Sequence, residues 1–339
     1  MHESANVITV TEIYDPLADK WTTSGNMAMP RLFHTATLLK SGKVLVAGSG
    51  GYTGYTARCE IYDPLTSQWS PAADMKTARG FHTATLLNSG QLLVTGGTTY
   101  NSDVLFTCEL YDPLTNTWSF AGNMTVARSS HTATLLNSGE VLVTSDGASS
   151  EIYDPSTGQW KSLTNMKSKG RYTSTASLLQ SGKVLVLGGT EAARYSPTSE
   201  IYDPSNNHWK PAGNMTTARA RHTSILLNSG EVLVTGGVGD TDFLDSCELF
   251  DPSTEKWSVT ATMLFERSSH TTTVLKSGKV LAAGGYGYYG YLYSSETYDP
   301  LTELWSPAGN LSLTRASHTA TLLNSGKVII AGGEKIGFN

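Results

Sequence analysis

Histidine recurs along the chain at a spacing that could bring several imidazoles together. One histidine follows an arginine by three residues in six places, at His34, His82, His131, His222, His270 and His318, and Ser174 takes the seventh place. Six imidazoles could form a metal site, because imidazole nitrogen is a common zinc ligand. However, packed sheets lie about 10 Å apart, whereas a zinc–imidazole bond is about 2.1 Å long. We therefore expect structural histidines that pack against the next repeat.

Arginine and glutamate recur in equal number, which suggests ion pairs. The arginines three residues before the histidine position are Arg31, Arg79, Arg128, Arg171, Arg219, Arg267 and Arg315. The glutamates that begin the motif Glu-x-(Tyr/Phe)-Asp-Pro are Glu12, Glu60, Glu109, Glu151, Glu200, Glu248 and Glu296. Seven acids matched with seven guanidiniums predict one charge-assisted contact in each repeat. We interpret these residues as structural rather than catalytic, because every copy has them.

The elements that position these residues follow from a repeat of nearly fifty residues. The aromatic residue of the Asp-Pro motif is Tyr14, Tyr62, Tyr111, Tyr153, Tyr202, Phe250 or Tyr298. Each is followed seven residues later by Trp21, Trp69, Trp118, Trp160, Trp209, Trp257 or Trp305, which are all the tryptophans of the chain. Such a period is typical of repeat architectures, in which each unit buries its faces against its neighbours.

One repeat contains four short runs of strand-forming residues separated by turns. Strand a runs from Arg128 to Leu136, and a tight turn at residues 137–139 leads to strand b at residues 141–144. Strand c holds residues 109–111, and an Asp-Pro turn leads to strand d, which holds Trp118. Four antiparallel strands make one blade. The sequence therefore predicts an all-β fold, a seven-bladed β-propeller.

The order of strands at the two ends predicts how the ring closes. The chain opens with a strand c and a strand d and stops after a strand b at Gly332-Gly333. One blade must then combine the N-terminal strands c and d, within about residues 1–27, with the C-terminal strands a and b, within about residues 315–339. This closure removes free sheet edges. We expect a single domain over residues 1–339.

These motifs resemble kelch repeats. The resemblance rests on the Gly-Gly pair after strand b, the tyrosine seven residues before a tryptophan, and the arginine that opens strand a. It covers essentially the whole chain and is greatest to kelch propellers of bacterial and galactose-oxidase type. The resemblance implies a seven-bladed propeller. It leaves the function open, because kelch propellers include oxidases, isomerases and interaction modules.

The cysteines do not match the copper chemistry of galactose oxidase, which the resemblance to kelch propellers of that type would imply. Cys59, Cys108 and Cys247 share one repeat position and are therefore too far apart for disulfides. We expect three buried, reduced thiols. The copper site of galactose oxidase needs a Tyr–Cys crosslink, a second tyrosine and two histidines outside the repeat, and no such cluster stands out. We therefore expect no cofactor, no metal site and no catalytic residue.

The charge and composition of the chain argue against several classes of partner. The net charge of −5 and the lack of a basic run argue against nucleic acid. No apolar stretch approaches the roughly 18 residues of a membrane helix, and the first residues lack a signal-peptide pattern. Localisation stays open, extracellular or cytoplasmic. We expect a monomer without a membrane span.

Tyrosine outside the repeat gathers in the loops at one end of the blades. The ten non-repeat tyrosines are Tyr52, Tyr55, Tyr100, Tyr172, Tyr195, Tyr286, Tyr288, Tyr289, Tyr291 and Tyr293. All lie in b–c connections except Tyr172, which lies beside a d–a turn. The a–b and c–d turns at the other end are short and nearly uniform. Tyrosine is favoured in binding loops because it offers rigid contact area with a polar tip.

Non-repeat residues just before the histidine position should line the inner rim, which is apolar at Phe33 and Phe81 and cationic at Arg221. Together with the loop tyrosines they predict one ligand-binding face. Its candidate residues are Arg221, Tyr286, Tyr288, Tyr289, Tyr291, Tyr172, Arg194, Tyr195, Phe81, Phe33, Tyr52 and Tyr55. The third blade departs from the pattern at Ser145-Asp146, which replaces Gly-Gly.

Three functions are compatible with this pattern. The first hypothesis is a non-catalytic binding module whose tyrosine-rich face holds a protein segment or a glycan. The alternative is a galactose-oxidase-like or isomerase-like enzyme that acts at the axial pocket around Arg221. Converging ionisable groups with shifted pKa values would favour the enzyme, and a broad aromatic surface would favour binding. The third is a structural repeat module of a larger surface protein.

Overall fold

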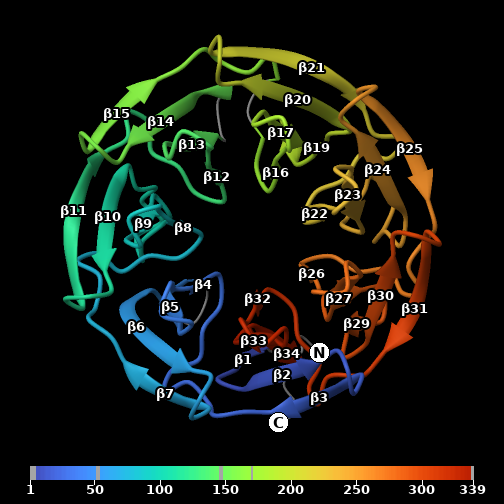
Figure 1. Ribbon diagram of the computed structural model, residues 1–339, viewed down its shortest axis with the longest axis horizontal. Helices are drawn as coiled ribbons and strands as arrows, with labels where there is room; N and C mark the ends of the chain where they lie inside the picture. Colours follow the sequence, from blue (N-terminus) through green and yellow to red (C-terminus); the bar gives the residue numbers. More distant parts are fainter. Residues whose placement is uncertain (1–4, 51–53, 145–147, 169–170, 337–339) are drawn as a thin grey trace.

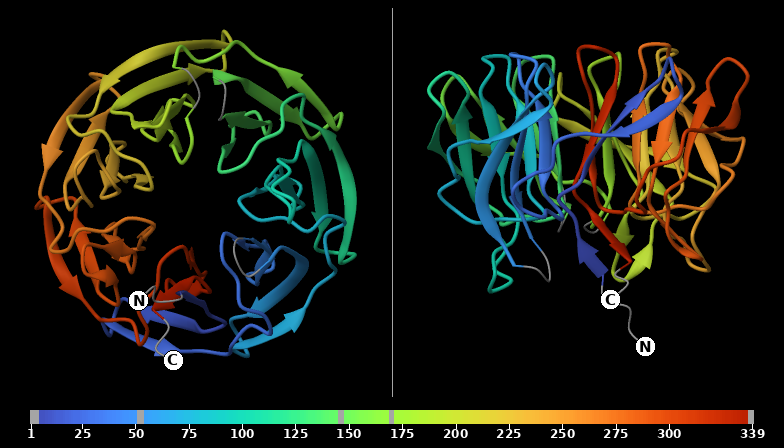
Figure 2. Two further views of the ribbon diagram at one scale, coloured as in Figure 1. Left: turned by 180° about the vertical axis from the view of Figure 1, so that it is seen from behind. Right: turned by 90° about the horizontal axis from the view of Figure 1, so that it is seen from below.

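Seven blades stand in a ring around a central axis, as expected (Figure 1). The computed structural model describes residues 5–50, 54–144, 148–168 and 171–336. Strand a is innermost and strand d outermost, and seen from the side the blades form a short cylinder (Figure 2). Within the described ranges no helix is long and apolar enough to cross a membrane.

Blades one to three are formed by consecutive strands. Blade one contains β4 (Thr35–Leu38), β5 (Val44–Ser49), β6 (Thr56–Asp63) and β7 (Gln68–Pro71). Blade two contains β8 (Thr83–Leu86), β9 (Leu92–Thr95), β10 (Thr107–Asp112) and β11 (Thr117–Asn123). Blade three contains β12 (Thr132–Leu135), β13 (Val141–Thr144), β14 (Ser150–Asp154) and β15 (Gln159–Ser162). Its Ser145-Asp146 segment lies outside the described residues.

Blades four to six follow the same order, and two of them carry an extra hairpin. Blade four contains β16 (Thr175–Leu178), β17 (Val184–Leu187), β20 (Thr198–Asp203) and β21 (His208–Asn214), with a hairpin of β18 (Thr190–Glu191) and β19 (Arg194–Tyr195). Blade five contains β22 (Thr223–Leu226), β23 (Val232–Thr235), β24 (Cys247–Asp251) and β25 (Lys256–Thr260). Blade six contains β26 (Thr271–Val274), β27 (Val280–Ala283), β30 (Ser295–Asp299) and β31 (Leu304–Ala308), with a hairpin of β28 (Tyr286–Gly287) and β29 (Gly290–Tyr291).

The closing blade joins the two ends of the chain, which confirms the predicted closure. Strands β2 (Thr11–Asp15) and β3 (Lys20–Thr23) complete a sheet with β32 (Thr319–Leu322) and β33 (Val328–Ala331). An additional pair, β1 (Ala5–Val7) with β34 (Glu334–Ile336), was not expected. It occupies the place of a b–c hairpin, so β1 and β34 lie on the loop face.

The apolar core lies between neighbouring blades. Leu45 and Cys59 of blade one pack with Val94, Tyr111 and Trp118 of blade two in one buried cluster. Equivalent clusters follow around the ring. Each blade therefore buries its faces only against its neighbours, as the repeat implied.

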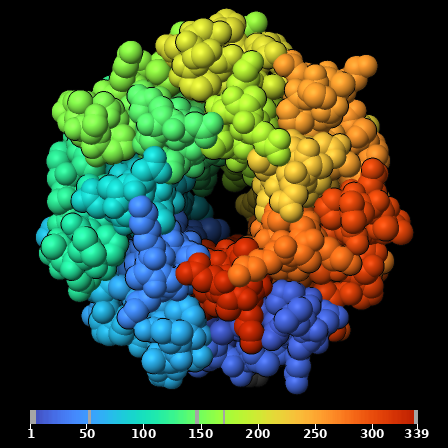
Figure 3. Space-filling model, in the orientation of Figure 1, coloured from blue at the N-terminus to red at the C-terminus, as the bar shows by residue number. Residues whose placement is uncertain are grey.

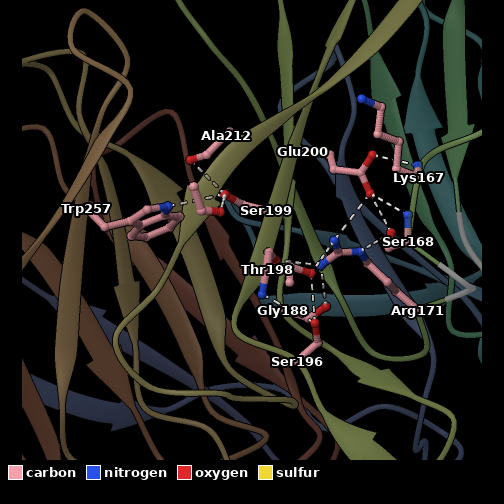
Figure 4. A network of polar contacts seen from close by, with 11 residues as sticks. Lys167, Ser168, Arg171, Gly188, Ser196, Thr198, Ser199, Glu200, Ala212 and Trp257 are labelled. Carbon is pink, nitrogen blue, oxygen red and sulfur yellow. Dashed lines mark hydrogen bonds and ion pairs between the residues drawn. The ribbon is translucent and has the colours of Figure 1, made fainter.

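The predicted ion pairs are present in all seven blades. Every arginine of the set is fully buried and lies 2.5–3.4 Å from the glutamate of strand c in its own blade. In blade four, Arg171 also donates to the backbone carbonyl and the side-chain hydroxyl of Thr198. Glu200 accepts the backbone N–H groups of Lys167 and Ser168 (Figure 4). The pair therefore ties the d–a connection to strands a and c.

The six histidines join one blade to the preceding one, which confirms the structural interpretation. The Nε2 atom of His82 lies 3.0 Å from Oγ1 of Thr35, and His222 lies 2.9 Å from Oγ1 of Thr175. Burial, followed by the charge of Arg219, lowers the pKa of His222 to about 3. The imidazoles are therefore neutral links between blades.

The shared position of the three cysteines is a second link between blades. Ser199 has this place in blade four, and its Oγ accepts the indole N–H of Trp257 from blade five at 3.2 Å (Figure 4). The cysteines are buried and free, as predicted. Cys59 has this position in blade one and offers no hydroxyl group. The indole N–H of Trp118 in blade two donates instead to the carbonyl of Ala73.

The face opposite the loops is less uniform than expected. Its c–d turns share one geometry, in which an aspartate accepts the backbone N–H of the residue two positions later. That later residue is almost fully exposed leucine in four neighbouring blades, at Leu17, Leu65, Leu114 and Leu301. It is serine in blades three to five, at Ser156, Ser205 and Ser253.

Candidate ligand-binding site at the axial mouth

Seven residues, one from each blade, surround the mouth of the axial channel on the loop face. They immediately precede the histidine position and have a positive φ, namely Phe33, Phe81, Ser130, Thr173, Arg221, Ser269 and Ser317, with φ between 49° and 56°. All seven line one cavity of about 940 Å³. The space-filling view, which presents the face opposite the loops, shows that the ring is also open at its centre on that side (Figure 3). We call these residues the axial ring.

A positive φ is uncommon for residues other than glycine, so the surrounding backbone must hold it in place. Neighbouring ring residues are linked by hydrogen bonds: Phe81 N–H donates to the carbonyl of Phe33 at 3.0 Å, and Ser269 N–H donates to that of Arg221 at 3.0 Å. The Gly-Gly pair packs directly beneath, since a Cβ on Gly237 would lie 2.6 Å from the carbonyl of Ala220. The fold thus directs seven side chains of four residue types toward one space.

The axial ring is asymmetric, as predicted. Phe33 and Phe81 stack with their ring centroids 3.9 Å apart and form an apolar wall. Three serines and a threonine supply hydroxyl groups, and Arg221 supplies a cation. A cavity with distinct apolar, hydroxyl and charged sides suits a specific ligand.

Arg221 differs from the seven arginines of the blades. Those are fully buried and paired, whereas the Arg221 side chain is exposed at the cavity. Among the described residues no acidic side chain pairs with its guanidinium. An uncompensated guanidinium is well suited to bind a carboxylate or another planar anion in a bidentate manner.

A second aromatic wall comes from the loops of blades five and six. Phe243 lies edge-to-face with Tyr286 at 5.4 Å between centroids, and Tyr286 with Tyr291 at 4.9 Å. All three line the cavity together with Arg221. Side chains from the loops of blades five and six and Arg221 therefore lie on one side of the cavity.

The C-terminal strand β34 adds an acid to this wall. Glu334 lines the cavity, and a hydrogen bond joins it to Tyr291. Burial, the charge of Glu334 and this bond all raise the pKa of Tyr291, so its hydroxyl stays protonated at neutral pH. Sequence reasoning missed Glu334. The sequence feature that identifies it is its position directly after a Gly-Gly pair. Tyr286 and Val238 have the same position in other blades and also line the cavity.

The predicted site residues fall into two groups. Those that line the cavity are Phe33, Phe81, Tyr195, Arg221, Tyr286 and Tyr291. Tyr288 and Tyr289 form the exposed tip of the β28–β29 hairpin, Arg194 and Tyr172 are exposed beside the cavity, and Tyr55 accepts a hydrogen bond from Thr98. Tyr52 lies outside the described residues. Phe243 and the ring hydroxyls complete the cavity.

The donor groups do not fit a copper site of the galactose-oxidase kind. Burial raises the pKa of Cys59, Cys108 and Cys247 to about 12, and these thiols lie in the blades rather than at the cavity. The histidines at the cavity, such as His222, direct Nε2 to threonine. Among the described residues no three His, Cys, Asp or Glu side chains are grouped to hold a metal ion.

The comparisons with known proteins agree with this architecture. The family described as "KLHDC2/KLHL20/DRC7 Kelch-repeats domain" matches residues 139–333, and the Kelch motif matches residues 44–76 and 79–125. No curated protein matches the chain.

Two solved structures share the fold at low sequence identity. One is described as "Novel fungal alcohol oxidase with catalytic diversity among the AA5 family, in complex with copper", at 17% identity and a TM-score of 0.74, covering 91% of this chain and 75% of that one. The other is YjhT, at 15% identity and a TM-score of 0.65, covering 83% of this chain and 98% of that one. These likenesses show the fold alone. Because the first family matches more than half of the chain, the protein belongs to the Kelch-repeat family.

Proposed function

We propose that this Kelch propeller is a binding module that holds a segment of a partner protein on its loop face. The axial cavity takes an anionic group of the segment against Arg221, and the aromatic walls hold its neighbours. The observation that carries this proposal is the exposed guanidinium of Arg221 inside an asymmetric cavity, with no acidic partner among the described residues.

A protein segment is favoured over the other hypotheses for two reasons. Kelch propellers commonly bind protein partners, and the cavity combines a charge, hydroxyl groups and aromatic faces, which suit an extended peptide. For the oxidase alternative, the cavity lacks the thiol that the copper chemistry requires. A glycan is bound by the same kinds of side chain. The test below must therefore distinguish glycan binding from peptide binding.

The test selects ligands without assuming their identity. A library of displayed random peptides and a glycan array are applied to the immobilised protein, and affinities of the selected peptides are measured by fluorescence polarisation. We expect selected peptides to share an acidic group. Arg221→Ser should weaken their binding by roughly 10- to 100-fold, because a hydrogen bond to a charged group contributes about 1.5–3 kcal/mol.

Serine is the matched substitution because Ser130, Ser269 and Ser317 have the same position and the same positive φ. Arg194→Ser removes an exposed arginine beside the cavity and should change affinity less than threefold. Equal losses in the two variants would show that the charge effect is not specific to the cavity. Binding on the glycan array alone would replace the peptide with a sugar as ligand.

The hairpin tip gives a second test of the loop face. Tyr288 is 68% exposed and Tyr289 is 90% exposed, so replacing both with serine should change the free energy of unfolding by less than about 0.5 kcal/mol. We expect the affinity for the selected peptides to fall. Tyr291 is left in place because it packs on Tyr286 and bonds Glu334. Unchanged affinity would restrict the site to the cavity.

A further inference from the structure

The described chain carries three copies of the sequence Asn-x-Ser/Thr, which is the acceptor for N-linked glycosylation when x is not proline. They are Asn123-Met124-Thr125, Asn214-Met215-Thr216 and Asn310-Leu311-Ser312. All three have the same repeat position, at the end of strand d, in blades two, four and six. The other blades have different residues at one or both of the two polar positions.

The structure presents all three acceptors in the same way. The middle residue of each is buried, with Met124 and Met215 at 3% exposure and Leu311 at 5%. Its backbone N–H donates to a carbonyl of the preceding connection, at 2.9, 2.8 and 2.8 Å. Because side chains alternate along an extended segment, the asparagine and the hydroxyl residue on either side both face solvent.

The acceptor side chains are available. Asn123, Asn214 and Asn310 are exposed, as are Thr125, Thr216 and Ser312. The three asparagine side chains make no hydrogen bond with any described residue. The backbone N–H of the hydroxyl residue is held by the glutamate of the ion pair, for example Thr216 by Glu248 at 2.6 Å. A glycan on the amide nitrogen would therefore displace no contact of the fold.

We propose that Asn123, Asn214 and Asn310 are N-glycosylation sites of this protein. The amide nitrogen forms a bond to the anomeric carbon of a lipid pyrophosphate-linked oligosaccharide. The bond from that carbon to the pyrophosphate oxygen breaks, the lipid pyrophosphate leaves with the electron pair, and the amide loses one proton. This modification is independent of the proposed function and places the chain in a secretory compartment.

One feature of the fold agrees with such a compartment. The three thiols are buried and have raised pKa values, so little thiolate is present to react with oxidants. The glycans would stand at the outer strands of alternate blades, where sheet edges are exposed. They would surround the loop face at its edge and leave the axial cavity open.

The chain contains its own negative controls. Asn26 and Asn165 have the same repeat position and are also exposed, but Ala28 and Lys167 replace the hydroxyl residue. The backbone N–H of Lys167 donates to Glu200 at 2.7 Å, as that of Thr216 does to Glu248. Lys167→Thr therefore creates a fourth acceptor with the same geometry.

The full chain is translated behind a cleavable signal sequence in the presence of endoplasmic-reticulum microsomes. Only chains that are protected from added protease are analysed. We expect three mobility steps that an amidase for N-glycans removes, and peptide mass spectrometry that places sugar on Asn123, Asn214 and Asn310. Each Asn→Gln variant should lose one step, and Lys167→Thr should gain one. Protected chains that carry no sugar at these sites, or sugar on Asn26 or unmodified Asn165, would overturn the proposal.

Discussion

At the residue scale, the repeated charges of this propeller are buried and therefore sensitive to the loss of one partner. Arg219 has no exposed surface and lies 2.9 Å from Glu248. Removal of one member leaves the other charge buried and uncompensated. Each of the seven arginines and seven glutamates therefore has a structural role in its own blade.

We expect Glu248→Gln to reduce the free energy of unfolding by about 3–5 kcal/mol, measured by urea denaturation. The control is the exposed pair of Lys279 and Asp299, which lie 3.1 Å apart on the opposite face. Lys279→Ala should cost less than about 1 kcal/mol. Equal costs for the two variants would contradict a special role for the buried pairs.

The tryptophans give a second prediction at this scale. Trp209 is 2% exposed, and its indole N–H donates to Oγ of Ser150 in the preceding blade. Trp209→Ala should cost about 3–5 kcal/mol, as for other buried aromatic residues. A cost below about 1 kcal/mol in thermal or urea unfolding would show that the packing between blades does not depend on this ring.

At the element scale, the closing blade depends on both ends of the chain. Strand β2 pairs with β33, Glu12 bonds Arg315, and the indole of Trp21 donates to Ser295. Deleting the residues before Met27 removes these contacts and exposes the edge of β33. We expect loss of soluble monomer in size-exclusion chromatography.

A circular permutant separates the loss of contacts from the loss of chain connectivity. Because β1 pairs with β34, a short linker joins the two ends, and new ends are placed in the exposed c–d turn at residues 205–206. This permutant should remain monomeric. A truncated chain with an unchanged melting temperature would show that the closure is unnecessary.

At the scale of the whole molecule, six neutral histidines link the ring and make its stability depend on pH. Burial, followed by the charge of the neighbouring arginine, lowers the pKa of His34, His131 and His222 from 6.5 to about 3 and places those of His82, His270 and His318 well below 6.5. These histidines therefore bind protons in the unfolded chain at pH values at which they stay neutral in the folded chain. The resulting stability is fully present above about pH 6.5 and is lost as the pH falls toward about 3.

We expect the free energy of unfolding to fall steeply between pH 7 and pH 5, with up to six protons taken up on unfolding. Equilibrium urea denaturation at a series of pH values gives this number as the slope. His222→Ser is the matched variant, since Ser174 has this place in blade four, and it should lower the proton uptake by one. A flat profile in this window would contradict the assignment of neutral, linking histidines.

Much of this fold was predictable because each blade repeats the same local requirements. The aromatic residue, the tryptophan, the Gly-Gly pair and the Arg–Glu pair each serve one blade and its neighbour, so their spacing predicts the number of blades and the closure. The hairpins β18–β19 and β28–β29 and the pair β1–β34 were not predicted, because they lie in connections that differ from copy to copy.

The sequence by itself determined the propeller, its closing blade, and the end of the blades at which unlike residues gather. Only the tertiary structure decided which of those residues share one space. Arg221, Phe33 and Glu334 meet at the axial cavity, whereas Tyr288 and Tyr289 stand outside it. The physical reason is that cavity residues lie in different blades and are separated by many tens of residues along the chain. They become neighbours only when the ring closes and the positive φ of the axial ring directs their side chains to the axis.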